Sequence, residues 1–288
     1  MAEATDDYPA PRATRLRRGQ AASEYDRRGY LIVPEILSPD LLSATRDEAT
    51  VICRGGRGPI EGVAAADDDD SDVAVLRRYL CIHFPHKISP LLREIGRRPA
   101  VVDILTEVLG PDVKMMQSML FFKAGGQPGQ AWHQDEAHIP TRDRSLTAVW
   151  IALDDATIDN GCLWVIPGSH RPGILHPVRR HHDGRFDATP EAYGFGHEGD
   201  AVPVELAAGG AVVFDGYLLH RSLPNTRPDA MRRALVNHYM SAQSLLGWCP
   251  PDDGQAMGTL DHRDILLVAG RDPYEASGIT NVMQPRLR

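Results

Sequence analysis

The part of the chain that follows Val113 most restricts the possible fold. Short apolar or alternating runs follow one another here, and Gly, Pro, Asn and Asp separate them. The runs that we expect to form strands are 114–123, 146–153, 162–166, 211–214 and 234–240. Several short strands with turn residues between them, and no alternation of strands with helices, are typical of an all-β sandwich or barrel.

The first 112 residues have a different pattern, which predicts helices. Ser38-Pro39-Asp40 is a typical helix start, with a hydroxyl cap, a proline at the first helical position and an acid in the first turn, and the helix should run to about Val51. Ser89-Pro90 caps another helix, and 99–109 forms a third that ends at Gly110-Pro111. Apolar residues recur at helical spacing in the last two. We therefore expect these N-terminal helices to pack on the barrel.

Length and composition favour one domain. A chain of 288 residues with 42% apolar content can bury one substantial core. We expect this domain to cover residues 23–288, beginning with a short helical turn and a strand at 29–33, and we expect residues 1–22, rich in Pro, Ala and Arg, to form a disordered tail. The acidic run at 67–70 is expected to be a solvated loop and not a cation site.

Charge and cysteine content exclude several classes of protein. The net charge of −8 and a pI near 5.8 argue against a nucleic-acid partner, which needs clustered Lys and Arg. The four cysteines form no C-x-x-C pair, so we expect reduced thiols. The sequence shows neither a membrane-spanning run nor a secretory signal, and acids near the N-terminus argue against a transit peptide. These observations predict a soluble, cytoplasmic protein with no membrane partner.

The stretch Trp132-His133-Gln134-Asp135 carries the first sign of chemistry. In an extended segment alternate side chains share a face, so His133 and Asp135 present an imidazole and a carboxylate to one side. Two histidines and one carboxylate occupy one face of an octahedral iron and leave the opposite positions open. The best candidate for the third ligand is His220, because an apolar, strand-like run precedes it and a polar turn follows. These three residues are the predicted metal ligands and catalytic residues.

Several segments together resemble the phytanoyl-CoA dioxygenase family over roughly residues 24–250. They are 117–123 (QSMLFFK), the His133-Gln134-Asp135 triplet, 148–153 (AVWIAL), 159–170 (DNGCLWVIPGSH), 220–225 (HRSLPN) and 232–235 (RRAL), in this order. The resemblance implies a double-stranded β-helix, also called a jelly roll and related to the cupin fold, that binds Fe(II) and the co-substrate 2-oxoglutarate. It also implies oxidation of an unactivated C–H bond with dioxygen.

The resemblance assigns further residues to the co-substrate pocket. Arg232 matches the residue that binds the distal carboxylate of 2-oxoglutarate, and a guanidinium can do this with two hydrogen bonds. Arg233 is its rival, because strand alternation sends the two side chains to opposite faces. Three residues of one earlier strand and one residue of a second strand match the pocket wall, although Met119 and Trp150 are also explained by ordinary core packing. These four residues are Gln117, Met119, Lys123 and Trp150.

The remaining histidines have weaker interpretations. His170 lies in a Pro-Gly-Ser-His turn, where hydrogen bonding to the loop is favoured over metal binding. His138 either contacts substrate or lies in an exposed loop. His181 and His182 belong to a long polar insertion, 171–200, which is either a lid over the site or an exposed loop.

The predicted reaction is hydroxylation of an aliphatic C–H coupled to decarboxylation of 2-oxoglutarate to succinate. The carboxylate of Asp135 favours a hydroxylase over a halogenase, since iron halogenases have Gly or Ala at this position. The substrate is either a small molecule, such as an amino acid or a natural product, or a fatty acyl-CoA, whose phosphates the basic residues of 171–185 would suit. Two alternatives stay open: a zinc-dependent hydrolase, which would have no need for Arg232, and a non-catalytic jelly-roll metal-binding protein.

Overall fold

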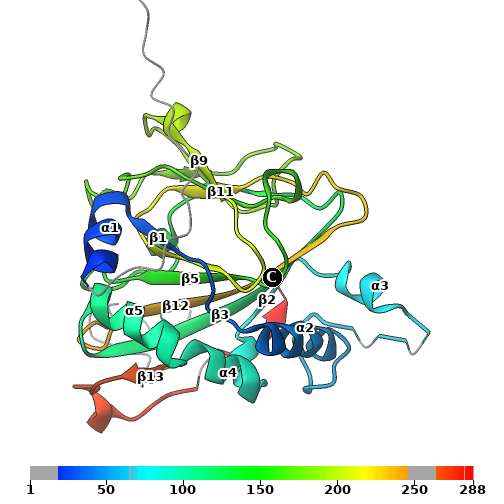
Figure 1. The fold of residues 1–288 in the computed structure, drawn as a ribbon, viewed down its shortest axis with the longest axis horizontal. Helices are drawn as coiled ribbons and strands as arrows, with labels where there is room; N and C mark the ends of the chain where they lie inside the picture. The colour runs from blue at the N-terminus through cyan, green and yellow to red at the C-terminus, as the bar shows by residue number, and fades with distance from the viewer. Residues whose placement is uncertain (1–18, 65, 68, 246–263, 282, 288) are drawn as a thin grey trace, which may run out of the picture.

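The computed structural model describes residues 19–64, 66–67, 69–245, 264–281 and 283–287 (Figure 1). The predicted tail therefore lies outside the described residues as far as residue 18. The helices are α1 (Gln20–Arg28), α2 (Pro39–Cys53), α3 (Asp72–Leu76), α4 (Pro90–Gly96) and α5 (Pro99–Leu109). Helix α1 begins three residues before the expected domain boundary. The carboxylate of Glu107 accepts hydrogen bonds from the first backbone N–H groups of α1, where the helix dipole favours a negative charge.

The predicted helix starts are confirmed in position, and one cap differs. Proline occupies the first turn of α2, α4 and α5. The Ser89 hydroxyl accepts the N–H of Leu92 at 3.2 Å, as expected of a cap. Ser38 holds the corresponding position before α2 but makes no side-chain cap bond, so the predicted hydroxyl cap is wrong there. The Ser38 carbonyl instead accepts the N–H of Leu42 at 2.8 Å.

Two antiparallel sheets form the body of the protein. The larger sheet has the order β1-β10-β5-β12-β3-β2-β14, with β13 also paired to β3, and the smaller has the order β4-β11-β6-β9. The strands of the larger sheet are β1 (Tyr30–Val33), β2 (Cys81–His83), β3 (Val113–Ala124), β5 (Thr147–Ala152), β10 (Ala211–Asp215), β12 (Met231–Ser241), β13 (Leu266–Ala269) and β14 (Arg286–Leu287). Those of the smaller are β4 (Gln130–His133), β6 (Leu163–Val165), β9 (Val202–Val204) and β11 (His220–Ser222), and β7 (Val178–Arg179) pairs separately with β8 (Glu191–Ala192). From β3 to β12 the chain passes repeatedly between the two sheets, which is the jelly-roll arrangement.

The larger sheet separates two hydrophobic cores, because successive side chains point to opposite faces. On β12, Ala234 and Val236 belong to the core between the sheets, whereas Leu235 belongs to the core shared with the helices. The second core includes residues of α1, α2, α4 and α5. Helices α2, α4 and α5 lie along the face of the large sheet away from β9 and β11, and α1 lies beside β1 (Figure 1). The site described below lies between the sheets, and these three helices lie on the opposite face of the large sheet.

Three other predictions from the sequence concerned the acidic run, the cysteines and membrane-spanning helices. Asp67 and Asp69 are exposed, whereas Asp70 forms an ion pair with Arg78. Cysteines 53, 81 and 162 are buried and form no disulfide bond with any described residue, and Cys249 lies outside the described residues. None of the described helices is long and apolar enough to cross a membrane.

Candidate metal centre and its two chambers

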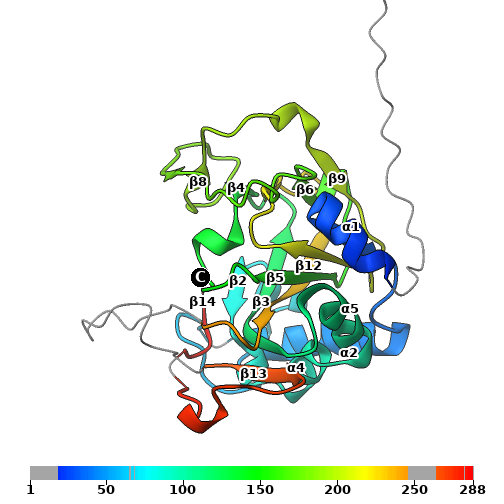
Figure 2. The same cartoon turned by 90° about the vertical axis from the view of Figure 1, so that its left-hand side faces the viewer.

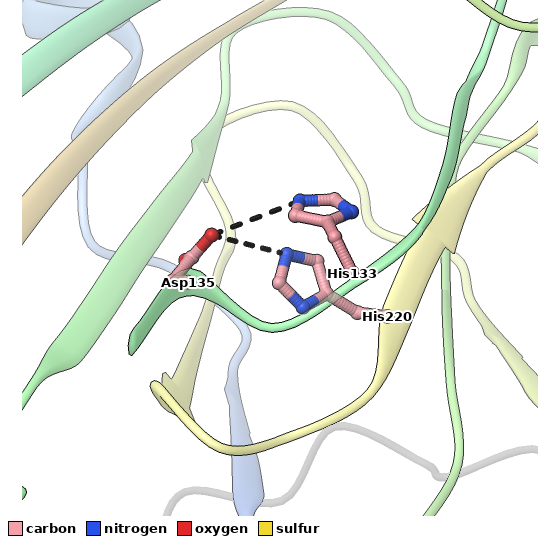
Figure 3. Close-up of side chains that lie close together, drawn as sticks. All are labelled: His133, Asp135 and His220. Carbon is pink, nitrogen blue, oxygen red and sulfur yellow. Dashed lines mark ion pairs between the residues drawn. The ribbon is translucent and has the colours of Figure 1, made fainter. Parts of the chain in front are cut away.

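The two predicted histidine ligands face each other on neighbouring strands of the smaller sheet. His133 ends β4, His220 begins β11, and the two are direct partners in the antiparallel register. Asp135 follows His133 after one extended residue and begins a single 3-10 turn. Asp135 Oδ1 lies 3.7 Å from His133 Nε2 and 3.6 Å from His220 Nε2 (Figure 3). Of all His, Cys, Asp and Glu side chains in the described ranges, these three form the one group close enough to share a metal ion.

The segment before His220 is not the continuous strand that its apolar sequence suggested. The apolar run 212–219 is not one strand, because β10 ends at Asp215 and a turn precedes β11. The Asp215 carboxylate accepts the N–H of Tyr217 at 2.7 Å, and the Asp215 carbonyl accepts the N–H of Leu218 at 2.9 Å. This turn moves the chain from the large sheet to the small one, and it thereby brings His220 to His133.

Backbone carbonyls fix the ring state of both histidines. His133 Nδ1 lies 2.8 Å from the carbonyl of Ala131, and His220 Nδ1 lies 2.9 Å from the carbonyl of Leu218. A carbonyl oxygen can only accept, so Nδ1 carries the proton in each ring and Nε2 keeps the lone pair that a metal needs. Burial, reinforced by the neighbouring His220, lowers the pKa of His133 well below its ordinary value. The donor set is therefore two imidazole nitrogens and a carboxylate oxygen, which suits Fe(II).

Gln134, between the two ligands, points away from the metal centre as predicted. Its amide nitrogen donates to the carbonyls of Ile174 and Tyr217 at 2.9 and 2.7 Å, and its oxygen accepts the N–H of His176 at 2.8 Å. This buried amide ties the start of the 171–200 insertion to the turn before His220. It thereby holds the backbone on both sides of the metal centre.

His238 is a further residue of the centre, which the sequence interpretation missed. Its Nε2 lies 3.1 Å from Asp135 Oδ2, the carboxylate oxygen that does not face the two histidines. Burial opposes ionisation of Asp135, but His220, His238 and His133 together outweigh it and lower the pKa of this carboxyl. Strand alternation could have indicated His238, because it shares the inner face of β12 with Arg232. This bond fixes the orientation of the Asp135 carboxylate, since Oδ1 is left free for the metal.

An inner chamber of about 80 Å³ opens beside the three ligands, and Arg232 lines it. The Arg232 side chain is 3% exposed, lies over the ring of Trp150 at 5.4 Å, and forms no ion pair with any described residue. Burial lowers the pKa of Arg232 to about 10, and its Nε has no hydrogen-bond partner among the residues that the structure covers. Burying a charge is costly unless the charge is paired, so this guanidinium is available to bind an anion in the chamber.

Arg233 lies on the opposite face and already has a partner. Its Nε and Nη2 donate to the two oxygens of Asp154, each at 2.8 Å, and its backbone N–H donates to the same carboxylate. Arg233 is therefore committed to an ion pair on the helix side of the sheet. The sequence left two candidates for the co-substrate contact, Arg232 and Arg233. The structure distinguishes them, because Arg232 faces the inner chamber and Arg233 does not.

Lys123 lies directly opposite Arg232 in the pairing of β3 with β12. Its ammonium donates to the Ser222 hydroxyl at 2.8 Å and to the Leu223 carbonyl at 2.7 Å. Burial, followed by the nearby charge of Arg232, lowers the pKa of Lys123 well below its ordinary value. Lys123 lines the inner chamber, and its contacts hold the end of β11 in place behind His220.

A larger outer chamber of about 620 Å³ shares the metal ligands His133 and Asp135 with the inner one. Gln117 lines the outer chamber, and Met119 lines both. His138 is exposed and lines the outer chamber, so it has the position expected of a substrate contact at the mouth. Residues 187–190 also line this chamber, so the insertion supplies a wall, whereas much of its remainder is exposed. Asp187 and Arg286 are lining residues that no sequence motif indicated.

The other histidines hold loops. His170 Nε2 lies 3.1 Å from the carbonyl of Asp26, and His181 Nε2 lies 2.9 Å from the carbonyl of Thr189. His182 is exposed. None of the three lines either chamber. The preference for a loop-bonded His170 over a metal-bound one agrees with this geometry.

Solved structures show the same fold at low sequence identity. A non-heme monooxygenase, ThoJ in its apo form, superposes with a TM-score of 0.67 at 23% identity and covers 93% of this chain and 87% of its own. EvdO2 from Micromonospora carbonacea var. aurantiaca, complexed with 2-oxoglutarate, gives 0.59 at 24% identity, covering 83% and 96%. EctD from S. alaskensis with bound Fe gives 0.61 at 20% identity, covering 83% of each chain. These similarities support the jelly roll.

Sequence comparison identifies the family. Phytanoyl-CoA dioxygenase domain-containing protein 1 of Danio rerio is 35% identical over 181 residues, which is 60% of each chain. Phytanoyl-CoA dioxygenase 1 of Oryza sativa subsp. japonica is 34% identical over 163 residues, 56% of this chain and 57% of the relative. The chain thus spans less than two thirds of the length of these relatives. The model of the family Phytanoyl-CoA dioxygenase (PhyH) matches residues 25–234, which include the three metal-ligand candidates and Arg232, and the chain therefore belongs to the phytanoyl-CoA dioxygenase family.

Proposed function

We propose that this protein is an Fe(II)- and 2-oxoglutarate-dependent dioxygenase that hydroxylates an aliphatic C–H bond of a small organic or acyl substrate. One observation carries the proposal. A 2-His-1-carboxylate group with both imidazoles held in the metal-binding tautomer borders a chamber that contains a buried, unpaired guanidinium. A metal site alone would not require that cation, and a second carboxylate from a chelating co-substrate would satisfy it.

The chain offers a residue for each part of the cofactor set. His133 Nε2, Asp135 Oδ1 and His220 Nε2 would hold iron, and Arg232 would bind the distal carboxylate of 2-oxoglutarate. Trp150 supports the guanidinium from one side. Iron and 2-oxoglutarate bound there would supply the oxidation, in which the co-substrate and dioxygen become succinate and carbon dioxide while one substrate C–H becomes C–OH.

The remaining residues orient the reactants and exclude water. His238 holds Asp135 Oδ2 and so directs Oδ1 to the metal. Lys123 fixes the end of β11, which carries His220. Leu80 and Met119 line both chambers and present an apolar surface where the two meet. We assign the outer chamber to the substrate, with Gln117 and His138 in its wall.

A titration without oxygen tests the cofactor assignment. Fe(II) and 2-oxoglutarate added together to the wild-type protein should give a visible metal-to-ligand charge-transfer band, and neither alone should do so. Admission of air should then release succinate, and Zn(II) in place of Fe(II) should release none. Absence of the band, or hydrolysis supported by Zn(II), would replace this proposal with the zinc hydrolase. The third possibility, a non-catalytic binding protein, has no support from the site, since all three ligands are present.

The outcome of the reaction should be hydroxylation and not halogenation. A halide needs a coordination position on iron, and the Asp135 carboxylate, which lies beside both histidines, would hold that position in this protein. With its true substrate and excess chloride, the wild-type enzyme should make mainly the alcohol, as mass spectrometry of the product would show. A mainly chlorinated product would contradict the role of Asp135. The cytoplasmic location and the single domain over residues 23–288 also remain predictions from the sequence.

A further inference from the structure

The outer chamber has a wall that lies outside the region matched by the family model. Met283 and Arg286 line the chamber, whereas the matched region ends at residue 234. Arg286 lies in β14, which pairs with β2 at the edge of the large sheet (Figure 2). This wall therefore depends on the C-terminal segment of this particular chain.

The C-terminal segment is held firmly enough to place a side chain. Lys87 and Asp264 form an ion pair at 2.5 Å, with their side chains only 11% and 8% exposed. The same Asp264 carboxylate accepts the N–H of Met283 at 2.7 Å, and Lys87 also donates to the Met283 carbonyl. The residue after Arg286 is also held, because the N–H of Leu287 donates to the Glu61 carbonyl at 2.8 Å. Arg286 is thus positioned by bonds on both sides.

The guanidinium of Arg286 has no anionic partner among the residues that the structure describes. Its side-chain contacts are the ring of Phe84, 5.6 Å from Cζ, and the sulfur of Met283, 3.8 Å from Nη1. Arg286 is half-buried and lines the outer chamber, where it is the one Arg or Lys among the lining residues. An arginine in this situation binds a carboxylate well, because its fork of donors matches two carboxylate oxygens.

A second group of unpaired atoms lies nearer to the metal ligands. Gln117 and His238 are partners in the register of β3 with β12, and both line the outer chamber. Their side chains are 5% and 2% exposed, yet Gln117 Oε1 and His238 Nδ1 have no hydrogen-bond partner within the described part of the chain. Gln117 Oε1 is a buried acceptor without a donor, so it points to a ligand that supplies a donor.

We infer that the substrate is a small carboxylic acid that also carries a hydrogen-bond donor, such as a hydroxyl group. Its carboxylate binds Arg286 at the wall formed by β14, and its donor is directed toward Gln117 Oε1 beside the metal ligands. This inference rests on the proposed function, because it takes the outer chamber to be the substrate site. It assigns substrate selection to the C-terminal segment.

Matched probes of one chain length test each half of the inference. The wild-type protein, loaded with Ni(II) and saturated with 2-oxoglutarate, is titrated calorimetrically with 6-hydroxyhexanoate, hexanoate, 1,6-hexanediol and hexyl phosphate. The hydroxy acid should bind at least about tenfold more tightly than the acid without the hydroxyl and the diol without the carboxylate, since each lost contact involves a charged or buried group. Four- and eight-carbon hydroxy acids extend the series.

Variants assign the two preferences to residues. Arg286→Ala should remove the preference for the hydroxy acid over the diol, whereas Gln117→Leu should reduce the preference for the hydroxy acid over hexanoate. Arg271→Ala is the matched control, because this exposed arginine of the same segment lines neither chamber. Arg286→Ala and Arg271→Ala should keep the charge-transfer band with Fe(II) and 2-oxoglutarate.

The results separate this inference from the proposed function. If the wild-type protein gives no charge-transfer band, the proposed function fails and this inference fails with it. If the band forms but no probe binds, or the diol binds as well as the hydroxy acid, or Arg286→Ala keeps the preference, only this inference is overturned. Tighter binding of hexyl phosphate than of hexanoate would overturn the assignment of a carboxylate.

Discussion

Exchanging Arg232 and Arg233 separately for alanine gives the sharpest test of the site. Arg232 faces the inner chamber without an ion pair to any described residue, so its charge is available to the co-substrate. Hydrogen bonds to charged groups contribute about 1.5–3 kcal/mol each and are not fully additive, so loss of a bidentate contact should cost on the order of 3 kcal/mol. Arg232→Ala should therefore weaken 2-oxoglutarate binding roughly a hundredfold, since about 1.4 kcal/mol is tenfold. Arg233→Ala should change this affinity little.

Stability should change in the opposite order. Arg233 and Asp154 form a bidentate pair with side chains 16% and 17% exposed, and Asp154 would keep only Arg46, at 3.4 Å, as a cationic partner. Arg233→Ala should lower the free energy of unfolding by about 2 kcal/mol, the usual contribution of hydrogen bonds between charged groups. Arg232→Ala loses packing on Trp150 but also removes an unpaired buried charge, so without co-substrate it should destabilise the protein less.

Two measurements on the same proteins test the expected changes in co-substrate affinity and in stability. Calorimetric titration of the Ni(II)-loaded variants with 2-oxoglutarate gives the affinities, and urea unfolding without metal or co-substrate gives the stabilities. Arg232→Lys is an informative intermediate, because it keeps the charge and loses the bidentate geometry. If Arg233→Ala weakened co-substrate binding and Arg232→Ala did not, the assignment drawn from the register would be wrong.

Three further predictions concern the metal ligands, the residue behind them and a distant histidine. Alanine in place of any one of the three ligands should abolish succinate release while leaving cooperative unfolding intact, and normal activity in any of these variants would remove that residue from the site. His238→Leu should weaken metal binding by about 10–100-fold in a chelator competition, because Asp135 loses the donor that orients it, and unchanged affinity would make the contact incidental. Burial, and then the charge of Lys87, lowers the pKa of His86 to about 3, so the unfolded state binds more protons than the folded state between about pH 3 and 6.5 and stability must rise with pH there. Acidification from pH 6.5 to 5 should cost about 2 kcal/mol through this residue, His86→Asn should flatten that slope in urea unfolding, and the exposed control His182→Asn should not.

Much of the fold and the metal centre could be predicted from the sequence, because the signals are local. Alternating apolar residues determine which face of a strand is buried, so the main strands from β3 to β12 were recognisable. The spacing of His133 and Asp135 places both side chains on one side of an extended segment, whatever the rest of the chain does. Pro at the first helical position likewise indicated α2, α4 and α5 before any contact was known.

The tertiary structure decided everything that depends on which strands become neighbours. Alternation showed that Arg232 and Arg233 face opposite ways, but only the pairing of β12 with β3 and β5 shows which way leads to the chamber and which to Asp154. His238 could not be assigned to Asp135 in advance, since a hydrogen bond across 103 positions leaves no periodic pattern. Arg286 reaches the outer chamber only because β14 pairs with β2, about 200 residues earlier in the chain. Sequence periodicity fixes the direction of a side chain relative to its own strand, and the packing of distant strands fixes what lies in that direction.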